Sequence, residues 1–323
     1  MKNVRLGNTN IEVTPIGLGV MTIGNTQLDL PLQEGAALVR YAYDQGIRFF
    51  DTAQYYETYP YMRRAFADID CSKENPDRPV ISSKSLILSY EEMEEAIEEA
   101  LRELDLEYID IFLLHEVRQD PDWDSRAGAW QCLRDYKAKG VIGAIGVSTH
   151  HIDVTERMAE TAECDIVFPL INYAGLGIRK GAGPGTAEGM ACAIKRCLAA
   201  GKGVFGMKAF GGGNLTGSYR RALDYVQSLG LHSIMVGMGK TEEVDRLIAY
   251  AEGTLPEDYT PDISGKKIHI DQGDCEGCGN CIERCPNKAI FRNENGLAEI
   301  NYEICLTCGY CAPVCPVRAI IMW

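Results

Sequence analysis

The chain has 323 residues, of which 46% are hydrophobic and 24% charged, a balance that excludes disorder as its main state. Its 32 basic residues face 46 acidic residues, a formal net charge of -14, whereas a nucleic-acid-binding surface needs an excess of Lys and Arg. No apolar run is long enough to span a membrane, and the first residues lack an apolar signal core. We therefore expect a cytoplasmic protein that binds neither nucleic acids nor membranes.

Segments with the patterns of strands and helices alternate from the N-terminus to about residue 250. Residues 4–13 predict a short hairpin, with its turn at Gly7, Asn8 and Thr9. Eight apolar segments then have the length and composition of buried strands: 16–19, 48–51, 80–84, 109–115, 142–148, 166–172, 204–209 and 233–237.

Amphipathic helices are predicted between these strands at 90–104, 127–139 and 188–200, and after the eighth strand at 241–251. Gly140 and Gly201 follow the second and third of them as helix-ending residues, and Thr241 is the expected N-cap of the last one. Eight strands with intervening helices predict an α/β fold, a (β/α)₈ barrel of the TIM type. A doubly wound open sheet is the alternative α/β arrangement.

The composition changes after the last predicted helix. Residues 253–266 are rich in Pro, Asp and Thr and predict a linker. The chain is therefore expected to consist of a barrel domain at 1–252 and a second, small domain at 267–323.

Eight of the 13 cysteines lie in this small domain. They form two copies of the pattern Cys-x₂-Cys-x₂-Cys-x₃-Cys-Pro, at Cys275, Cys278, Cys281 and Cys285 and at Cys305, Cys308, Cys311 and Cys315. Disulfides are rare in cytosolic proteins, and zinc sites generally use paired Cys-x₂₋₄-Cys motifs, so both are weaker explanations than iron. Soft thiolates at this spacing are typical of [4Fe–4S] clusters.

The repeat resembles a bacterial two-cluster ferredoxin over the whole length of the tail, which implies a small α+β domain with two [4Fe–4S] clusters. In that pattern the fourth cysteine of each repeat binds the cluster of the other repeat. The resemblance therefore assigns one cluster to Cys275, Cys278, Cys281 and Cys315, and the other to Cys305, Cys308, Cys311 and Cys285.

Four chemically complementary side chains lie at the ends of three successive strands of the predicted barrel. Asp51 and Tyr56 end or follow the second strand, Lys84 ends the third, and His115 ends the fourth. Barrel enzymes carry their chemistry at the carboxyl ends of the strands. We expect Lys84 to pair with Asp51 and to lower the pKa of the Tyr56 phenol, while His115 donates a hydrogen bond to a substrate oxygen.

With these residues in place, the first 250 residues resemble an aldo-keto reductase. The matching motifs are Asp51-Thr52-Ala53-x-x-Tyr56, Lys84 after a strand, Leu113-Leu114-His115, Gly146-Val147-Ser148 and a late Val-Gly before a helix. The resemblance implies a catalytic tetrad of Asp51, Tyr56, Lys84 and His115, and an extended nicotinamide cofactor bound without a Rossmann domain. Glu57 departs from the family pattern, which has Gly after the tyrosine.

The resemblance also implies where the cofactor binds. Ser148 and Asn172 are expected to hold the nicotinamide carboxamide, and backbone N–H groups of Gly211, Gly212 and Gly213 are expected to cradle the diphosphate. Gly237 and Lys240 would lie at the adenine end, where Val244 occupies the position of the family's phosphate-binding Arg. Both NADP(H) and NAD(H) therefore stay open as the cofactor.

The sequence thus predicts an NAD(P)H-dependent oxidoreductase that interconverts a small carbonyl compound, an aldehyde or ketone, and an alcohol. Its two clusters would serve an external one-electron carrier, shape the substrate gate or stabilise the fold. The alternatives are a redox-sensing or partner-docking module that binds NAD(P)H with little turnover, and a plain electron carrier. The oligomeric state stays open.

Overall fold

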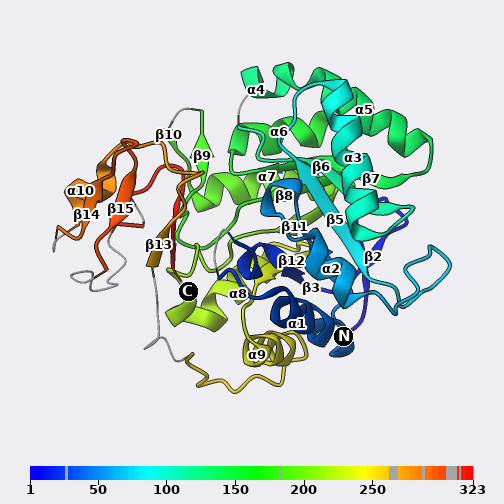
Figure 1. Ribbon diagram of the computed structural model, residues 1–323, viewed down its shortest axis with the longest axis horizontal. Coiled ribbons are helices and arrows are strands. Elements are labelled where there is room, and N and C mark those ends of the chain that lie inside the picture. Colours follow the sequence, from blue (N-terminus) through cyan, green and yellow to red (C-terminus); the bar gives the residue numbers. More distant parts are fainter. Residues whose placement is uncertain are drawn as a thin grey trace.

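The computed structural model describes residues 1–25, 28–118, 120–181, 183–261, 268–285, 288–302, 311–312 and 314–322. Its centre is a closed barrel of parallel strands, whose consecutive members are hydrogen-bonded neighbours and whose last strand pairs with the first. The strands are β3 (Ile16–Gly19), β4 (Phe49–Asp51), β5 (Val80–Ser85), β6 (Ile109–Leu114), β7 (Ile142–Thr149), β8 (Ile166–Pro169), β11 (Gly203–Gly206) and β12 (Ser233–Gly237). All eight predicted strands are therefore confirmed (Figure 1).

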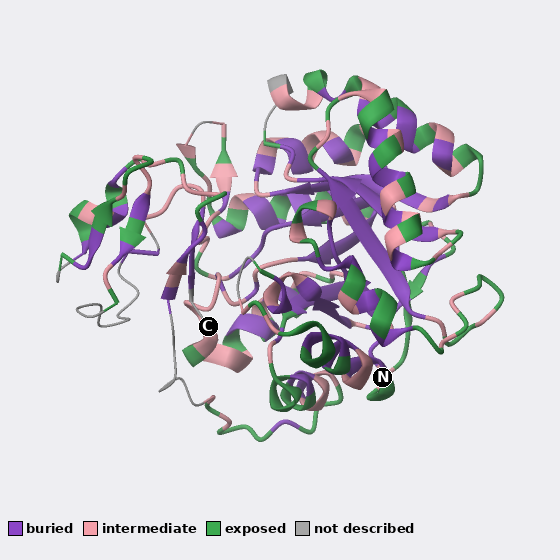
Figure 2. Cartoon of the chain, viewed as in Figure 1, coloured by how far each residue is buried: buried purple, intermediate pink, exposed green. Residues whose placement is uncertain are grey.

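Helices surround the barrel because its strands are apolar on both faces and need cover on the outside. Figure 2 shows the strands as an almost continuous buried layer within a shell of mixed exposure. The helices are α1 (Leu32–Asp44), α2 (Tyr59–Ala65), α3 (Tyr90–Leu104), α4 (Asp120–Ser125), α5 (Ala127–Ala138), α6 (Ile152–Glu160), α7 (Ala187–Ala199), α8 (Tyr219–Ser228) and α9 (Thr241–Ala251). Among the described residues, no helix has the length and apolar character to cross a membrane.

Local sequence explains where these helices begin. The Ser89 hydroxyl accepts the N–H of Glu92 and caps α3, which begins at the residue predicted for it. The N-cap of α9 is Lys240 rather than Thr241, since Lys240 keeps an extended backbone and Thr241 is already helical. That prediction was wrong by one residue.

The N-terminal hairpin closes the amino end of the barrel. Its strands β1 (Val4–Arg5) and β2 (Glu12–Val13) are antiparallel, with Val4 opposite Val13. Leu6 and Val13 are fully buried in one cluster with the barrel-interior residues Phe49 and Phe205. Because this end is filled, the carboxyl ends of the strands are left for a functional site.

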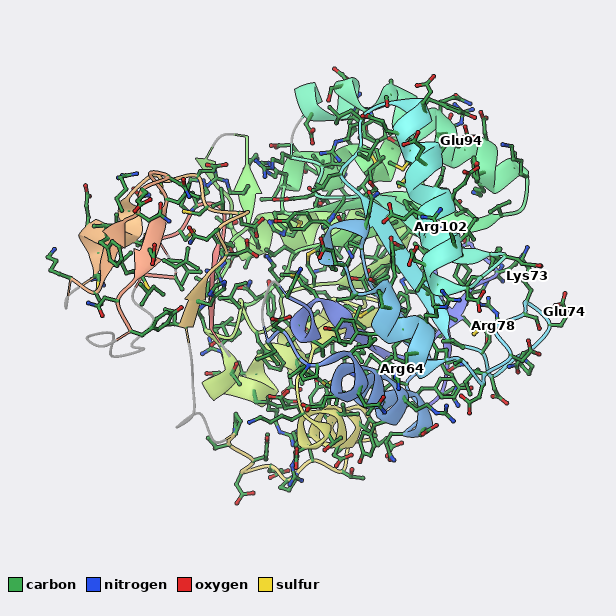
Figure 3. All side chains as sticks on the ribbon, in the orientation of Figure 1. Arg64, Lys73, Glu74, Arg78, Glu94 and Arg102 are labelled. Carbon is green, nitrogen blue, oxygen red and sulfur yellow. The ribbon has the colours of Figure 1, made fainter. Side chains whose placement is uncertain are left out.

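A buried ion pair joins two strands at the amino end of the barrel. The Arg78 guanidinium donates two hydrogen bonds to the carboxylate of Asp110, which also accepts the N–H of Ile81. Figure 3 labels Arg78, on the side of the barrel remote from the C-terminal domain. This contact ties the start of β5 to β6.

The C-terminal domain is a small α+β unit with its own hydrophobic core. Strand β13 (Ile268–Ile270) pairs antiparallel with β16 (Ile320–Met322), and β14 (Ile290–Arg292) with β15 (Ala298–Ile300), around helix α10 (Asn280–Arg284). The domain lies beside the barrel near the hairpin of β9 (Arg179–Lys180) and β10 (Gly183–Pro184) (Figure 1). Of the predicted linker, residues 253–261 are described and the remainder lies outside the described residues.

Candidate functional site

The four expected tetrad residues come together at the carboxyl ends of β4, β5 and β6. Asp51 is the last residue of β4, and Lys84 is the second-to-last residue of β5. His115 directly follows the end of β6. The parallel register places Asp51 beside Ser82 and Lys84 beside Leu113, so the strand ends are in step. Adjacent strands are about 5 Å apart, and this spacing brings the side chains into contact.

Lys84 and Asp51 form a buried ion pair. The Lys84 Nζ lies 2.6 Å from Asp51 Oδ2 and donates a second hydrogen bond, of 2.7 Å, to the carbonyl oxygen of Thr52. The Lys84 side chain is only 1% exposed. Burial lowers the pKa of Lys84 and raises the pKa of Asp51, while their mutual attraction opposes both shifts. The expected pairing of these two residues is present in the structure.

Tyr56 and His115 face each other close to this ion pair. The Tyr56 Oη and His115 Nε2 are 3.2 Å apart, and the two rings meet edge to face with their centroids 5.4 Å apart. The Lys84 Nζ lies 4.8 Å from the centroid of the Tyr56 ring. The phenol, imidazole and ammonium therefore converge on one point.

Contrary to the expectation, Lys84 does not bring the pKa of the Tyr56 phenol below its ordinary value. Burial raises the pKa of Tyr56 well above its ordinary value, and the carboxylates of Asp51, Asp274 and Glu116 raise it further. The physical reason is that burial removes the water that would stabilise a phenolate, while Asp51 offsets the charge of Lys84. Tyr56 is consequently held as a neutral phenol, the form that donates a proton.

His115 is held neutral as well. Burial lowers the pKa of His115 well below its ordinary value, and the positive charges of Lys84, Arg126 and Lys208 act in the same direction. Arg126 also donates a hydrogen bond of 2.7 Å to the backbone carbonyl of His115. A neutral imidazole in this position can exchange hydrogen bonds with a substrate oxygen without introducing a charge.

The turn that presents Tyr56 explains the departure at Glu57. Residues Gln54–Tyr56 form a single 3₁₀ turn, and Glu57 ends it with a left-handed backbone at φ 54°. Glycine adopts this conformation freely, whereas a residue with a side chain adopts it at a cost. The Glu57 carboxylate accepts a hydrogen bond of 2.8 Å from Asn25, a contact that glycine could not make. The turn keeps its shape despite the substitution.

Ser148 and Asn172 lie at the same end of the barrel with their polar atoms partly engaged. The Ser148 hydroxyl accepts the N–H of Glu116 at 2.8 Å and keeps its own hydrogen for another partner. The Asn172 amide donates to the carbonyl of Leu176 and accepts from its N–H, both at 2.9 Å, so it braces a loop. Their expected contacts with a carboxamide stay predictions.

The three consecutive glycines after β11 form a tight loop. Gly211, Gly212 and Gly213 have φ values of 58°, 67° and 85°, a left-handed run that residues with side chains rarely adopt. The Gly211 N–H donates to the carbonyl of Lys208 at 2.8 Å, and the Asn214 amide donates to Gly211 at 2.7 Å. The expected contacts of this loop with a diphosphate stay predictions.

At the expected adenine end, Gly237 ends β12 so close to a neighbour that an added Cβ would lie 2.0 Å from the Thr22 hydroxyl. Lys240 is exposed at the start of α9, whereas Val244 is fully buried in the core. The position of the family's Arg therefore cannot reach a ligand here. Glu243 accepts the Gly239 N–H at 2.7 Å, which places a carboxylate beside Lys240. The choice between NADP(H) and NAD(H) stays open.

The cysteines of the first expected cluster, Cys275, Cys278, Cys281 and Cys315, all lie among the described residues. Burial raises the pKa of Cys281 to about 11, and the neighbouring thiols of Cys315, Cys278 and Cys275 contribute to the shift. The Cys275 sulfur also accepts the N–H of Ala298 at 3.4 Å, a contact of the kind that tunes iron–sulfur sites. Thiols are the donor type that a [4Fe–4S] cluster requires.

The second expected cluster is only partly described. Cys285 and Cys311 are buried, and the Cys285 sulfur accepts the N–H of Ala289 at 3.2 Å. Cys305 and Cys308 lie outside the described residues. Among the residues that the structure covers, no three Cys, His, Asp or Glu side chains already stand at metal-ligand spacing. The ligand assignments therefore stay predictions.

Sequence reasoning missed the residues of the C-terminal domain that lie at the barrel mouth. Burial raises the pKa of Asp274 to about 6, with Lys208 opposing and Glu116 reinforcing the shift. Nearby, Glu276 lies 3.5 Å from the guanidinium of Arg118. Lys208 follows the end of β11, so the strand-end rule that selected Lys84 would also have selected it. Asp274 carries no comparable signal.

Two family models match the chain. Residues 15–247 match the Aldo/keto reductase family, and residues 267–316 match the 4Fe-4S dicluster domain. Both matches coincide with the resemblances drawn from the motifs. They confirm the expected fusion of a reductase barrel with a ferredoxin-like tail.

Curated proteins similar to the chain match it at low sequence identity and over about half of their length. The chain is 29% identical over 161 residues to a methylglyoxal reductase of Yersinia pestis, covering 50% of this chain and 53% of that protein. It is 23% identical over 179 residues to an L-galactose dehydrogenase of Arabidopsis thaliana, covering 54% and 56%. The chain thus spans about half the length of the curated relatives it matches.

Solved structures share the barrel. PA4992 of Pseudomonas aeruginosa, described as an aldo-keto reductase, superimposes with a TM-score of 0.63 at 24% identity, covering 79% of this chain and 96% of that one. A Bombyx mori aldo-keto reductase in complex with NADP gives a TM-score of 0.58 at 18% identity, with coverages of 81% and 89%. These likenesses support the fold.

Proposed function

The chain belongs to the aldo/keto reductase family, and on that premise we propose that it reduces a small aldehyde or ketone to the alcohol, or runs the reverse reaction, with NADP(H) or NAD(H). Aldo/keto reductases use NADP(H), and a 4Fe-4S dicluster domain holds two [4Fe–4S] clusters. The two family matches therefore support the expected nicotinamide cofactor and the two expected clusters. The observation that carries the proposal is the convergence of Tyr56, His115 and the Lys84–Asp51 pair.

The nicotinamide, when bound, supplies two electrons and a hydrogen to the carbonyl carbon, and the protein must supply a proton to the carbonyl oxygen. Tyr56 is suited to this role because it is a neutral phenol 3.2 Å from His115. A substrate oxygen within hydrogen-bond distance of both Tyr56 Oη and His115 Nε2 would accept hydrogen bonds from both. The products are the alcohol and the oxidised nucleotide, and Tyr56 regains its proton from solvent.

Lys84 has a positioning role in this proposal. Its ammonium is fixed by Asp51 and by the Thr52 carbonyl, so it can lie against the Tyr56 ring without moving. As the Tyr56 proton leaves, the nearby positive charge opposes the build-up of negative charge on the phenol oxygen. Preorganised charge of this kind needs no rearrangement during the reaction.

Among the roles expected for the clusters, the placement of the C-terminal domain favours shaping the substrate gate. The carboxylate of Asp274, directly before the expected ligand Cys275, lies close enough to raise the pKa of Tyr56. A substrate reaching Tyr56 would therefore pass a wall built by the iron–sulfur domain. The role in which the clusters serve an external one-electron carrier stays a proposal, and no contact among the described residues supports it.

A pair of adjacent tyrosines tests the proton donor. Tyr56→Phe should lower anaerobic NADPH oxidation with a panel of aldehydes and ketones by about 10²–10⁴-fold, the usual contribution of a general acid. Tyr55→Phe is the matched control, because the Tyr55 side chain is 44% exposed and its hydroxyl packs against Gly273. Nucleotide affinity, measured by fluorescence titration, should be unchanged in both variants.

Two results would contradict the proposal. Equal turnover in Tyr56→Phe and the unmodified protein would remove Tyr56 from the acid role. Tight nucleotide binding without turnover on any carbonyl in the panel would favour the module that binds NAD(P)H as a sensor.

A further inference from the structure

Arg318 connects the iron–sulfur domain to the glycine loop of the barrel. One terminal nitrogen of its guanidinium donates to the carbonyl of Gly211, and the other donates to the carbonyl of Ala312 at 3.1 Å. Arg318 is only 4% exposed to solvent. Arg318 follows Cys315 by three residues, and its N–H donates to the Cys315 carbonyl at 3.3 Å. One residue thus contacts both a cluster-ligand segment and the expected diphosphate loop.

Two glycines of the barrel make room for this side chain. A Cβ added at Gly177 would lie 2.5 Å from Arg318 Cγ, and one added at Gly212 would lie 3.2 Å from Arg318 Nη2. Both glycines have left-handed backbones, at φ 82° and 67°. The slot between them therefore fits an arginine only because neither loop carries a side chain at these positions.

The guanidinium is a buried cation without a carboxylate among the described residues. Its Nε has no hydrogen-bond partner there, and burial lowers the pKa of Arg318 with only the Cys315 thiol acting against it. A second cation, Lys208, lies nearby: burial lowers the pKa of Lys208 and Arg318 lowers it further, while Asp274 and Glu116 oppose the shift. Burying an unpaired charge is costly, so a compensating anion is required. A [4Fe–4S] cluster with its four thiolate ligands carries a net negative charge, and Cys315 is one of the expected ligands.

We propose that Arg318 is the counter-ion of the cluster bound by Cys315 and links the redox state of that cluster to nucleotide binding at the Gly211–Gly213 loop. The link rests on the proposed function, since it requires a dinucleotide diphosphate at this loop. Reduction adds one negative charge to the cluster, so a fixed cation beside it stabilises the reduced form and raises the midpoint potential. A diphosphate at Gly211 would compete for the same cation.

The linkage has a defined sign. A bound diphosphate partly neutralises Arg318, so the cluster becomes harder to reduce when the nucleotide is present. By reciprocity, the nucleotide binds more weakly when the cluster is reduced, by the same factor. Arg318 is a positioning residue in this scheme, because it touches the loop and the ligand segment but not the reacting atoms.

The test uses the full-length protein, reconstituted anaerobically with both clusters and titrated potentiometrically with electron paramagnetic resonance as the readout. Arg318→Met should make reduction of one cluster at least tenfold less favourable, about 59 mV for a one-electron couple, and leave the other cluster unchanged. The nucleotide probe is 2′-phospho-ADP-ribose, which carries the diphosphate but no redox-active ring. It should lower one midpoint in the unmodified protein and have a smaller effect in Arg318→Met.

Three further variants separate charge from geometry. Arg318→Lys keeps the charge but cannot hold both carbonyls, so it should retain the midpoint and lose much of the nucleotide response. Gly177→Ala displaces Arg318 from the barrel side and should also weaken the response, even if Arg318→Met fails to fold. Arg179→Met is the matched control, because Arg179 donates to the Pro316 carbonyl at 3.3 Å in the same segment without a described contact to Gly211. It should leave the nucleotide response intact.

Each outcome has a separate meaning. A midpoint that stays the same in fully loaded Arg318→Met would overturn the counter-ion role. A probe that binds by calorimetry but shifts no midpoint would overturn the linkage alone. If the unmodified protein binds neither the probe nor NADP(H) nor NAD(H), the proposed function fails, and the linkage fails with it.

Discussion

Replacing Lys84 by Met should turn the buried ion pair into a buried, uncompensated carboxylate. The wild-type contact of 2.6 Å between Lys84 Nζ and Asp51 Oδ2 corresponds to an attraction of about 6 kcal/mol at an effective dielectric constant of about 20. Desolvation of the two charges offsets much of this attraction. Removing one partner alone nevertheless costs about 3–5 kcal/mol, because the other charge stays buried. We expect Lys84→Met to lose that much stability near neutral pH.

The loss should depend on pH with a definite sign. Without Lys84, the folded-state pKa of Asp51 lies above its unfolded value of about 3.9, since burial already raises it in the native pair. Below the unfolded value both states are protonated and no penalty arises. As the pH rises between the two values, only the unfolded state releases the proton, so the penalty grows by about 1.4 kcal/mol per pH unit. Lys84→Met should therefore be closer to wild type at pH 5 than at pH 7.

The double variant Asp51→Asn/Lys84→Met removes both charges. It should recover to within about 2 kcal/mol of wild type, the residual reflecting the Thr52 carbonyl that loses its donor. Urea unfolding followed by the fluorescence of Trp123 and Trp130, which both lie in the barrel, measures each free energy. The reasoning would be refuted if Lys84→Met lost the same stability at pH 5 and pH 7, or if the double variant were no more stable than the single one.

Three other predictions concern the chemistry, the barrel and the clusters. The rate of carbonyl reduction should stay flat from about pH 7 to 9, because the pKa of Tyr56 is raised well above 10 and that of His115 is lowered well below 6.5, so neither titrates there, while Asp274, with a pKa of about 6, is already ionised. A stopped-flow profile that falls within this range would contradict the prediction. Gly146→Ala should destabilise the barrel by about 3 kcal/mol or more, since the new Cβ would lie 1.8 Å from the Ile166 carbonyl oxygen. Thermal unfolding measures this loss of stability, and an unchanged unfolding temperature would show that β7 and β8 can separate freely. Cys278→Ala should lose iron by elemental assay while the barrel keeps its far-ultraviolet circular dichroism, and full iron content would reject Cys278 as a ligand.

The sequence by itself determined the barrel, because buried parallel strands leave near-continuous apolar runs that can be counted. It also determined the ferredoxin-like tail, since its cysteine spacing is written in adjacent residues. The tetrad could be selected for the same reason: Asp51, Lys84 and His115 each end a strand, and parallel strands bring their carboxyl ends to one rim. Local patterns and one topological rule were sufficient for these features.

Only the tertiary structure decided the electrostatics and the contacts between the domains. The pKa of Tyr56 depends on burial and on the charges of Asp51, Glu116 and Asp274, and the last of these comes from more than 200 positions further along the chain. Arg318 likewise meets Gly211 across 107 positions. Such long-range effects follow no sequence period, because a charge acts through its distance in space and through the solvent excluded around it.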